Sequence, residues 1–170
     1  MRIKAYPHRK DLYRHLPKSG VGAEIGVQFG INAEFLHTIA EPQHLYLVDA
    51  WQQEWGDHVC NCVKARFTDY ESVEIVRQVS VEWANSLPAH HLDWVYLDSS
   101  HMYEATRNEL LALIPKIKPG GMIAGHDLNI WGYWKSGVIR PVLECVQEGL
   151  LDVIAVTEDA PCPSFLAKVS

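Results

Sequence analysis

The chain has 170 residues, 48% of them hydrophobic, and its formal net charge is -6 at pH 7. This length and apolar content suit one three-layer domain over residues 1–170, with 1–19 as an N-terminal arm or helix. The negative charge argues against nucleic acid as the main partner, because phosphate binding depends on clustered Lys and Arg. No apolar run reaches about 18 residues, so we expect no membrane partner and a cytoplasmic protein.

A strand, a glycine turn and a helix are predicted from residue 21 onward. Apolar residues alternate over 21–25, Gly26 and Gly30 mark the turn, and Asn32 is a suitable N-cap for the helix that follows. Glycines let a backbone approach a ligand closely, because they lack a Cβ and tolerate positive φ. Glu24 stands at the carboxyl end of the strand, where open α/β sheets bind ligands.

A second strand is predicted over 45–48, and it ends in Asp49. A carboxylate at that place can accept hydrogen bonds from both hydroxyls of an adenosine ribose. The dinucleotide fingerprint G-x-G-x-x-G places a pyrophosphate on a helix N-terminus. Here the pattern is Glu24-x-Gly26-x-x-x-Gly30, without the middle glycine, which favours an adenosine cofactor that carries no phosphates.

The segment after Asp49 mixes large apolar and polar residues. We expect a loop over 50–61 whose Trp51 and Trp55 either contact the adenine or the substrate or cover the sheet edge. A helix is predicted over 62–76 and the third strand over 75–79, which ends at Ser80. The four cysteines have no zinc-site spacing and are expected to be reduced thiols.

Polar residues follow the next two predicted strands. Strand 94–98 ends in Asp98 and is followed by His101, while strand 122–125 leads into His126 and Asp127. We expect these four side chains to converge at one edge of the sheet, as a metal site, an acid/base site or a polar network. Later segments are a helix over 104–114, an aromatic loop over 129–137 as substrate wall, a helix over 138–148, and strands over 150–157 and 164–169.

These motifs, in this order, resemble the class I S-adenosylmethionine-dependent methyltransferases. The resemblance rests on the acid-x-G-x-x-x-G pattern, on Asp49, and on the segments 92–98 and 117–123. It is closest to the small single-domain methyltransferase family 24, with macrocin and related sugar O-methyltransferases as more distant relatives. It implies a three-layer α/β Rossmann-like fold, with a seven-stranded mostly parallel sheet and an antiparallel strand near the C-terminus. The residues that it implies for binding S-adenosylmethionine are Glu24, Gly26, Gly30, Asp49, Ser80 and Asp98.

The resemblance also implies a reaction, in which an oxygen of a small-molecule acceptor attacks the sulfonium methyl group in line. His126 is the first choice as general base, because an imidazole has its pKa near neutrality, and His101 is the second. Asp98 and Asp127 are candidate oxygen ligands for a divalent cation such as magnesium. Leu128 stands where metal-using relatives often carry a further acid or Asn, which argues against the metal.

Two other functions remain open. One is a nicotinamide-dependent oxidoreductase, which Asp49 favours and the missing glycine opposes. The other is a non-catalytic module that binds adenosine cofactors. Because the N-terminal segment is short, the substrate cleft is expected either to be open or to be completed by another subunit, so a homo-oligomer is one expectation.

Overall fold

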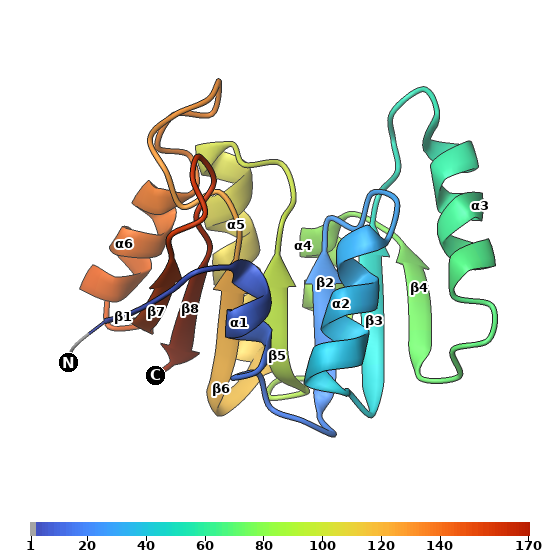
Figure 1. The fold of residues 1–170 in the computed structure, drawn as a ribbon, viewed down its shortest axis with the longest axis horizontal. Coiled ribbons are helices and arrows are strands. Elements are labelled where there is room, and N and C mark those ends of the chain that lie inside the picture. The colour runs from blue at the N-terminus through green and yellow to red at the C-terminus, as the bar shows by residue number, and fades with distance from the viewer. Residues whose placement is uncertain (1–2) are drawn as a thin grey trace.

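The computed structural model describes residues 3–170. It contains one eight-stranded sheet in the order β1-β7-β8-β6-β5-β2-β3-β4, which Figure 1 shows from its left to its right side. The strands are β1 Lys4–Tyr6, β2 Val21–Ile25, β3 His44–Asp49, β4 Val73–Arg77, β5 Leu92–Leu97, β6 Ile117–Gly125, β7 Leu151–Thr157 and β8 Phe165–Val169. The helices are α1 Arg9–Tyr13, α2 Ile31–Ala40, α3 Gly56–Arg66, α4 Ser80–Ser86, α5 Tyr103–Leu113 and α6 Ile139–Gln147, with a 3₁₀ turn, η1, at Ile114–Lys116.

Helices cover both faces of the sheet, as a three-layer fold requires. Buried residues of α1, α2 and α3 pack with one set of strand side chains, and buried residues of α4, α5 and α6 pack with the other. The two cores exist because successive strand residues point to opposite faces. In β5, for example, Trp94 and Tyr96 belong to one core and Val95 and Leu97 to the other. This confirms the predicted α/β architecture.

The chain order of the strands creates a switch point between β2 and β5. From β2 the chain adds β3 and β4 on one side, and it then crosses over to place β5 and β6 on the other. All of these strand pairs are parallel. In sheets of this kind the ligand crevice lies at the carboxyl ends of the strands that flank the switch point.

The antiparallel strand lies where the sequence predicted it. β8 runs antiparallel to both neighbours, with Ala167 opposite Ile123 of β6 and Val153 of β7. Its side chains at 165, 166 and 167 are fully or nearly fully buried, as expected for a strand inserted in the middle of a sheet.

The prediction of seven strands was wrong, because β1 adds an eighth. This three-residue strand pairs in parallel with β7, at Lys4↔Ala155 and Tyr6↔Thr157. The segment KAY has neither the length nor the alternation that marks a strand in the sequence. The segment is a strand because its backbone pairs with β7, which is distant in the sequence. The 1–19 segment thus holds both β1 and α1.

The predicted boundaries between residues 50 and 79 were also wrong. α3 begins at Gly56 and ends at Arg66, so the helix occupies part of the expected 50–61 loop. Phe67 and Tyr70 suggested a longer helix, but they pack on each other beyond its end, with ring centroids 5.1 Å apart. β4 then spans Val73–Arg77 and stops two residues earlier than predicted.

The start of α2 differs from the prediction by two residues. Gly30 is the N-cap, in a left-handed conformation with φ 76°, and Asn32 lies inside the first turn. A glycine reaches this conformation without a Cβ penalty. The Asn32 side chain is therefore free for another contact. Over residues 3–170, none of the helices has the length and apolar character of a membrane span.

Candidate active site

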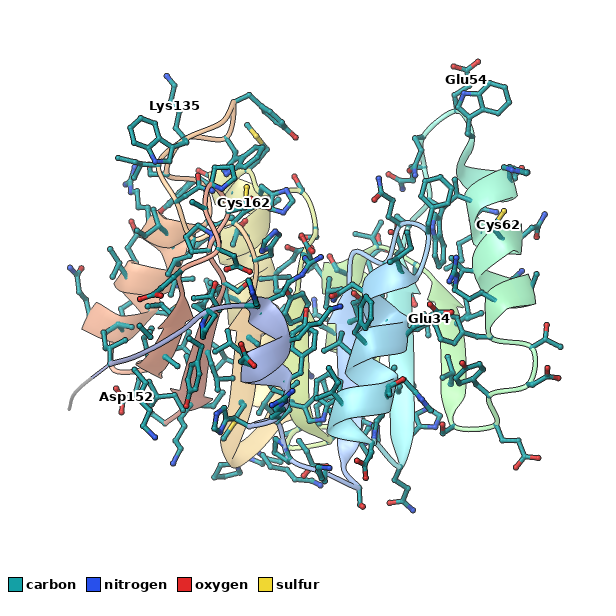
Figure 2. The ribbon with its side chains drawn as sticks, in the orientation of Figure 1. Glu34, Glu54, Cys62, Lys135, Asp152 and Cys162 are labelled. Carbon is teal, nitrogen blue, oxygen red and sulfur yellow. The ribbon has the colours of Figure 1, made fainter. Side chains whose placement is uncertain are left out.

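A cavity of about 740 Å³ opens at the carboxyl ends of β2, β3 and β5. It lies at the switch point. Two loops rise above this edge of the sheet and carry the labelled residues Glu54 and Lys135 (Figure 2). All six residues predicted to bind the cofactor belong to the elements around this edge. Five of them line the cavity together with His101: Glu24, Gly26, Asp49, Ser80 and Asp98.

Glu24 is a buried carboxylate with one unsatisfied oxygen. Only 1% of the residue is exposed. Its Oε1 accepts a hydrogen bond of 2.8 Å from the Asn32 amide, and the Asn32 oxygen accepts one of 2.6 Å from the Tyr13 hydroxyl. Oε2 has no partner among the described residues. Burial raises the pKa of Glu24 to about 8, against the opposing effect of the Asn32 bond. A buried polar atom without a partner costs free energy, so Oε2 is suited to a ligand donor.

Gly26 is required because the backbone that follows β5 lies directly against it. Its φ is 85°, and a Cβ at this position would lie 2.2 Å from the Asp98 carbonyl oxygen. The ends of β2 and β5 therefore approach each other as closely as glycine allows. Gly30 faces the Phe67 ring instead, and it serves as the α2 N-cap rather than as a lining residue of the cavity.

Asp49 organises the loop above it through its carboxylate. Oδ2 accepts hydrogen bonds from the backbone N–H groups of Val27 and Gln28, at 3.0 and 2.9 Å, and Oδ1 accepts one from Trp51 at 2.8 Å. A carboxylate has about four acceptor positions, so one remains for a ligand hydroxyl. The Trp51 indole donates to the Gln28 carbonyl and is 1% exposed. Trp51 thus forms part of the cavity wall, whereas Trp55 is 70% exposed and outside it.

Two serines that line the cavity hold one buried carboxylate. Ser80, the first residue of α4, and Ser99, just after β5, donate to the two oxygens of Glu109, each at 2.5 Å. Burial raises the pKa of Glu109 against the effect of these two bonds. Ser80 lies in the cavity as predicted, and its hydroxyl oxygen can still accept a bond from a ligand.

His101 lies between two carboxylates. Its Nε2 is 3.1 Å from Asp98 Oδ1 and 2.9 Å from Asp127 Oδ2. Burial alone would lower the pKa of His101, but hydrogen bonds to Asp127 and Asp98 outweigh it and raise the pKa to about 9. Burial acts against ionisation of Asp127 as well, yet the bond from His101 brings its pKa to about 2. Both His101 and Asp127 adopt positive φ, a conformation that non-glycine residues adopt rarely and often at functional sites.

His126 is near this group but differs in its contacts. Its Nδ1 lies 3.0 Å from the Ser164 hydroxyl, and it is not among the residues that line the cavity. His126, Asp127 and Cys162 offer side-chain atoms within 4.8 Å of one another. The nearby Asp127 carboxylate raises the pKa of the Cys162 thiol to about 11. All four cysteines are free thiols.

The predicted metal ligands Asp98 and Asp127 also meet, and with His101 they place candidate ligand atoms within 4.8 Å. The imidazole Nε2, however, already occupies the space between the two carboxylates as their hydrogen-bond partner. A cation could enter only if His101 gave up this position. The donor set as it stands therefore fits an ion-paired network better than a divalent cation, and the metal site remains a prediction.

The loop over 129–137 carries aromatic side chains beside the polar group. Trp131 and Tyr133 are 68% and 76% exposed. Trp134 packs edge-on against Tyr133 and lies 5.3 Å from the His101 ring, centroid to centroid. Its indole N–H has no partner among the described residues. This loop adjoins the cavity on the His101 side.

The model of a methyltransferase domain, family 24, matches residues 23–128, which are more than half of the chain. The chain belongs to this family. Its place among the class I S-adenosylmethionine-dependent methyltransferases, expected from the ordered motifs, is thereby confirmed.

Individual relatives of this methyltransferase domain are distant. It is 24% identical over 112 residues to the uncharacterized protein y4gI of Sinorhizobium fredii, a match that covers 58% of this chain and 12% of that protein. The chain thus spans a small part of the length of that curated relative.

Solved structures share the fold over nearly the whole chain. NodS, an N-methyltransferase from Bradyrhizobium japonicum in complex with S-adenosyl-L-homocysteine, has a TM-score of 0.70 at 14% identity and covers 95% of this chain and 85% of its own. An rRNA methylase from Streptococcus thermophilus has a TM-score of 0.68 at 12% identity, with 94% and 93% covered. A SAM-dependent methyltransferase from Aquifex aeolicus has a TM-score of 0.66 at 17% identity, with 91% and 85% covered. At such identities they establish the fold alone.

The sequence did not point to two of the charged residues in the cavity. Arg9 reaches it from α1, with Nη1 3.7 Å from Asp98 Oδ2. Glu109 faces it from α5, a helix whose charged residues would ordinarily be read as solvent-exposed. Neither residue belongs to a recognised motif. For Arg9, the one available signal was its place in a basic segment directly before the first predicted strand.

Proposed function

We propose that this domain binds S-adenosylmethionine in the 740 Å³ cavity and transfers its methyl group to a small molecule. The observation that carries the proposal is the buried Glu24 carboxylate: the residue lines the cavity, and its Oε2 has no partner among the described residues. The α-ammonium of the cofactor would supply the missing donor, and its positive charge would lower the raised pKa of Glu24, so that Glu24 binds it as a carboxylate. A ligand with a cationic amine and an adenosine group matches a cavity that has Glu24 at the β2 end and Asp49 at the β3 end.

Asp49 supports the adenosine part of the proposal. Its fourth acceptor position can receive a ribose hydroxyl, while its three backbone bonds hold the glycine loop against the cofactor. Ser80 would contact the adenine. The charge of the cavity argues against a nicotinamide dinucleotide. Its lining includes the acids Glu24, Asp49, Asp98 and Glu109, which would repel a pyrophosphate.

The acceptor would enter on the side of His101 and the 129–137 loop. S-adenosylmethionine supplies an electrophilic methyl group on a sulfonium, so the protein's own task is to align a nucleophile and accommodate its proton. We assign the acceptor a hydroxyl group, because His101 and its two carboxylates offer a place for the released proton. His101 lines the cavity and is our choice as proton acceptor, in the neutral form that it reaches as the pH approaches its pKa of about 9, so activity should rise toward alkaline pH. His126 is the alternative.

Binding and activity measurements test the proposal. Calorimetry with S-adenosylhomocysteine should show saturable binding to the domain, and NAD and NADP should bind more weakly or not at all. Tighter binding of NAD would contradict the assignment. Binding of S-adenosylhomocysteine without methyl transfer to any of a panel of hydroxyl-bearing small molecules would favour the non-catalytic module.

The test also covers a macromolecular acceptor and a metal. The net charge of -6 supports a small-molecule acceptor over a polyanion, and methylation of RNA in a parallel assay would overturn that part of the proposal. Loss of activity with a chelator, restored by magnesium, would show a metal requirement at Asp98 and Asp127. Insensitivity to the chelator would assign these residues to the polar network.

A further inference from the structure

The cavity contains one strongly basic side chain in an acidic environment. Its lining includes four carboxylates, those of Glu24, Asp49, Asp98 and Glu109, and within residues 3–170 Arg9 is the only Lys or Arg that lines it. An Arg guanidinium in such a place can neutralise acids or receive an anionic group of a ligand. The geometry of its contacts distinguishes these two roles.

The guanidinium of Arg9 has two polar neighbours in the cavity, the Tyr96 hydroxyl and the Asp98 carboxylate. Its contact with Asp98 is 3.7 Å long, which is beyond hydrogen-bond distance. A guanidinium has five N–H donors in a planar fork, so several of them remain available beside Asp98 and the Tyr96 hydroxyl. The Arg9 side chain is one-third exposed, so the cavity side of the group is open to a ligand.

The backbone of Arg9, by contrast, is firmly placed. Its N–H donates to Asp159 Oδ2 at 3.1 Å. The strand β1, which precedes α1, is paired with β7. Figure 1 shows that β1 leads into α1. The eighth strand, absent from the predicted sheet, therefore fixes the position of α1, the helix from which Arg9 reaches the cavity.

Two residues of α1 act at the same end of the cavity. Arg9 and Tyr13 are four residues apart and so lie on one face of the helix. Tyr13 donates to Asn32, which donates to Glu24. One residue of this face thus supports the buried carboxylate, and the other brings a cation close to it. A site that pairs an unpartnered carboxylate oxygen with an open guanidinium is complementary to a zwitterion.

We propose that Arg9 binds the α-carboxylate of the cofactor's methionine moiety while Glu24 Oε2 binds its α-ammonium, so that this end of the cavity selects an intact amino acid. This inference rests on the proposed function and names a specificity-determining residue for it. Arg9 would form two parallel N–H···O bonds with the carboxylate, as guanidinium and carboxylate groups commonly do. The long contact to Asp98 would then orient the Arg9 guanidinium without occupying the N–H donors that bind the carboxylate.

Calorimetry with three ligands tests the inference: S-adenosylhomocysteine, its decarboxylated analogue, and 5′-methylthioadenosine, which lacks the whole amino acid. In the wild type, loss of the carboxylate alone should weaken binding about 10- to 100-fold. Arg9→Ala should weaken S-adenosylhomocysteine by the same factor and leave the affinities for the other two ligands nearly unchanged. Arg9→Lys should retain part of the preference, because it keeps the charge and loses the fork.

Lys10→Ala is the matched control. Lys10 is the neighbouring cation on α1, and its amine lies over the Phe35 ring at 3.3 Å, outside the cavity lining. It should leave all three affinities unchanged. If the wild type bound the decarboxylated analogue as tightly as S-adenosylhomocysteine, or if Arg9→Ala retained the preference, the role of Arg9 would be refuted while the proposed function stood. Absence of S-adenosylhomocysteine binding to the wild type would overturn both. Should Arg9→Ala not fold, the wild-type comparison and Arg9→Lys decide.

Discussion

The two sides of the cavity are built in different ways. On the β2–β3 side, backbone N–H groups satisfy Asp49, and a chain of hydrogen bonds from Tyr13 through Asn32 satisfies one oxygen of Glu24. On the β5–β6 side, His101 pairs with the carboxylates of Asp98 and Asp127, and Asp127 Oδ1 has no partner among the described residues. His101 and Asp127 have positive φ. The first side has a fixed shape that suits an invariant cofactor. The second depends on protonation states, which suits proton transfer.

Exposure differs between the two sides as well. Trp51, on the cofactor side, is almost fully buried. Trp131 and Tyr133, next to the polar group, are mostly exposed. Large exposed aromatic side chains commonly mark a binding surface. We therefore propose the closed side for the cofactor and the open side for the acceptor, and each of the following experiments tests one of these two placements.

The largest effect is expected from His101→Ala. If His101 accepts the proton, methyl transfer should fall by about 10²- to 10⁴-fold, the range for losing general acid-base catalysis, while the affinity for S-adenosylhomocysteine changes little. His126→Ala is the matched variant, because His126 lies beside Asp127 but outside the cavity lining. A larger loss in His126→Ala than in His101→Ala would reverse the assignment. Full activity in both variants would leave alignment of the acceptor as the catalytic device.

Asp49→Ala should have the next largest effect, this time on binding. Loss of the ribose contact and of the loop's hydrogen bonds should weaken S-adenosylhomocysteine about 10- to 100-fold. Because three backbone N–H groups lose their acceptor, the melting temperature should fall as well. Asp49→Asn keeps one acceptor oxygen and should fall between the wild type and Asp49→Ala in both measurements. Unchanged affinity with a lowered melting temperature would restrict Asp49 to a structural role.

The same division explains what the sequence could predict. Glu24, Gly26 and Asp49 stand at fixed spacings along a strand, turn and helix, so local pattern alone places them at one sheet edge. The convergence of Asp98, His101 and Asp127 was also predictable, because parallel strands that are neighbours in the sheet end at the same edge. In both cases the strand ends determine the geometry.

What the sequence could not predict depends on contacts between distant segments. β1 is a strand because β7 lies beside it, and Arg9 enters the cavity because Asp159, 150 residues away, holds its backbone. Glu109 is buried because Ser80 and Ser99 donate to it from two other elements. Their local sequences carry no periodicity or motif that announces these roles.

A third experiment tests the burial of Glu24 through pH. Its pKa is about 8 in the folded protein, above the ordinary value of 4.5, so the native state keeps a proton that the unfolded state has lost. Stability should therefore decrease as pH rises from about 4.5 to about 8, by about 1 kcal/mol or more. In Glu24→Gln this contribution disappears. Urea unfolding of the wild type and of Glu24→Gln across that pH range measures this contribution. If the free energy of unfolding changed with pH equally in the two proteins, Glu24 would not be protonated in the native state.

The smallest effect is expected from Ser80→Ala, and it locates the adenine. If the Ser80 hydroxyl contacts the base, Ser80→Ala should weaken S-adenosylhomocysteine and 5′-methylthioadenosine alike, by about two- to fivefold, as for one neutral hydrogen bond. Ser99→Ala is the matched control, because Ser99 donates to the same Glu109 carboxylate from the end of β5. Both variants remove one donor from Glu109, so a change that merely reflects this buried carboxylate should appear equally in the two. A loss of 5′-methylthioadenosine affinity in Ser80→Ala alone would place the adenine beside α4, whereas equal losses would assign both serines to the support of Glu109.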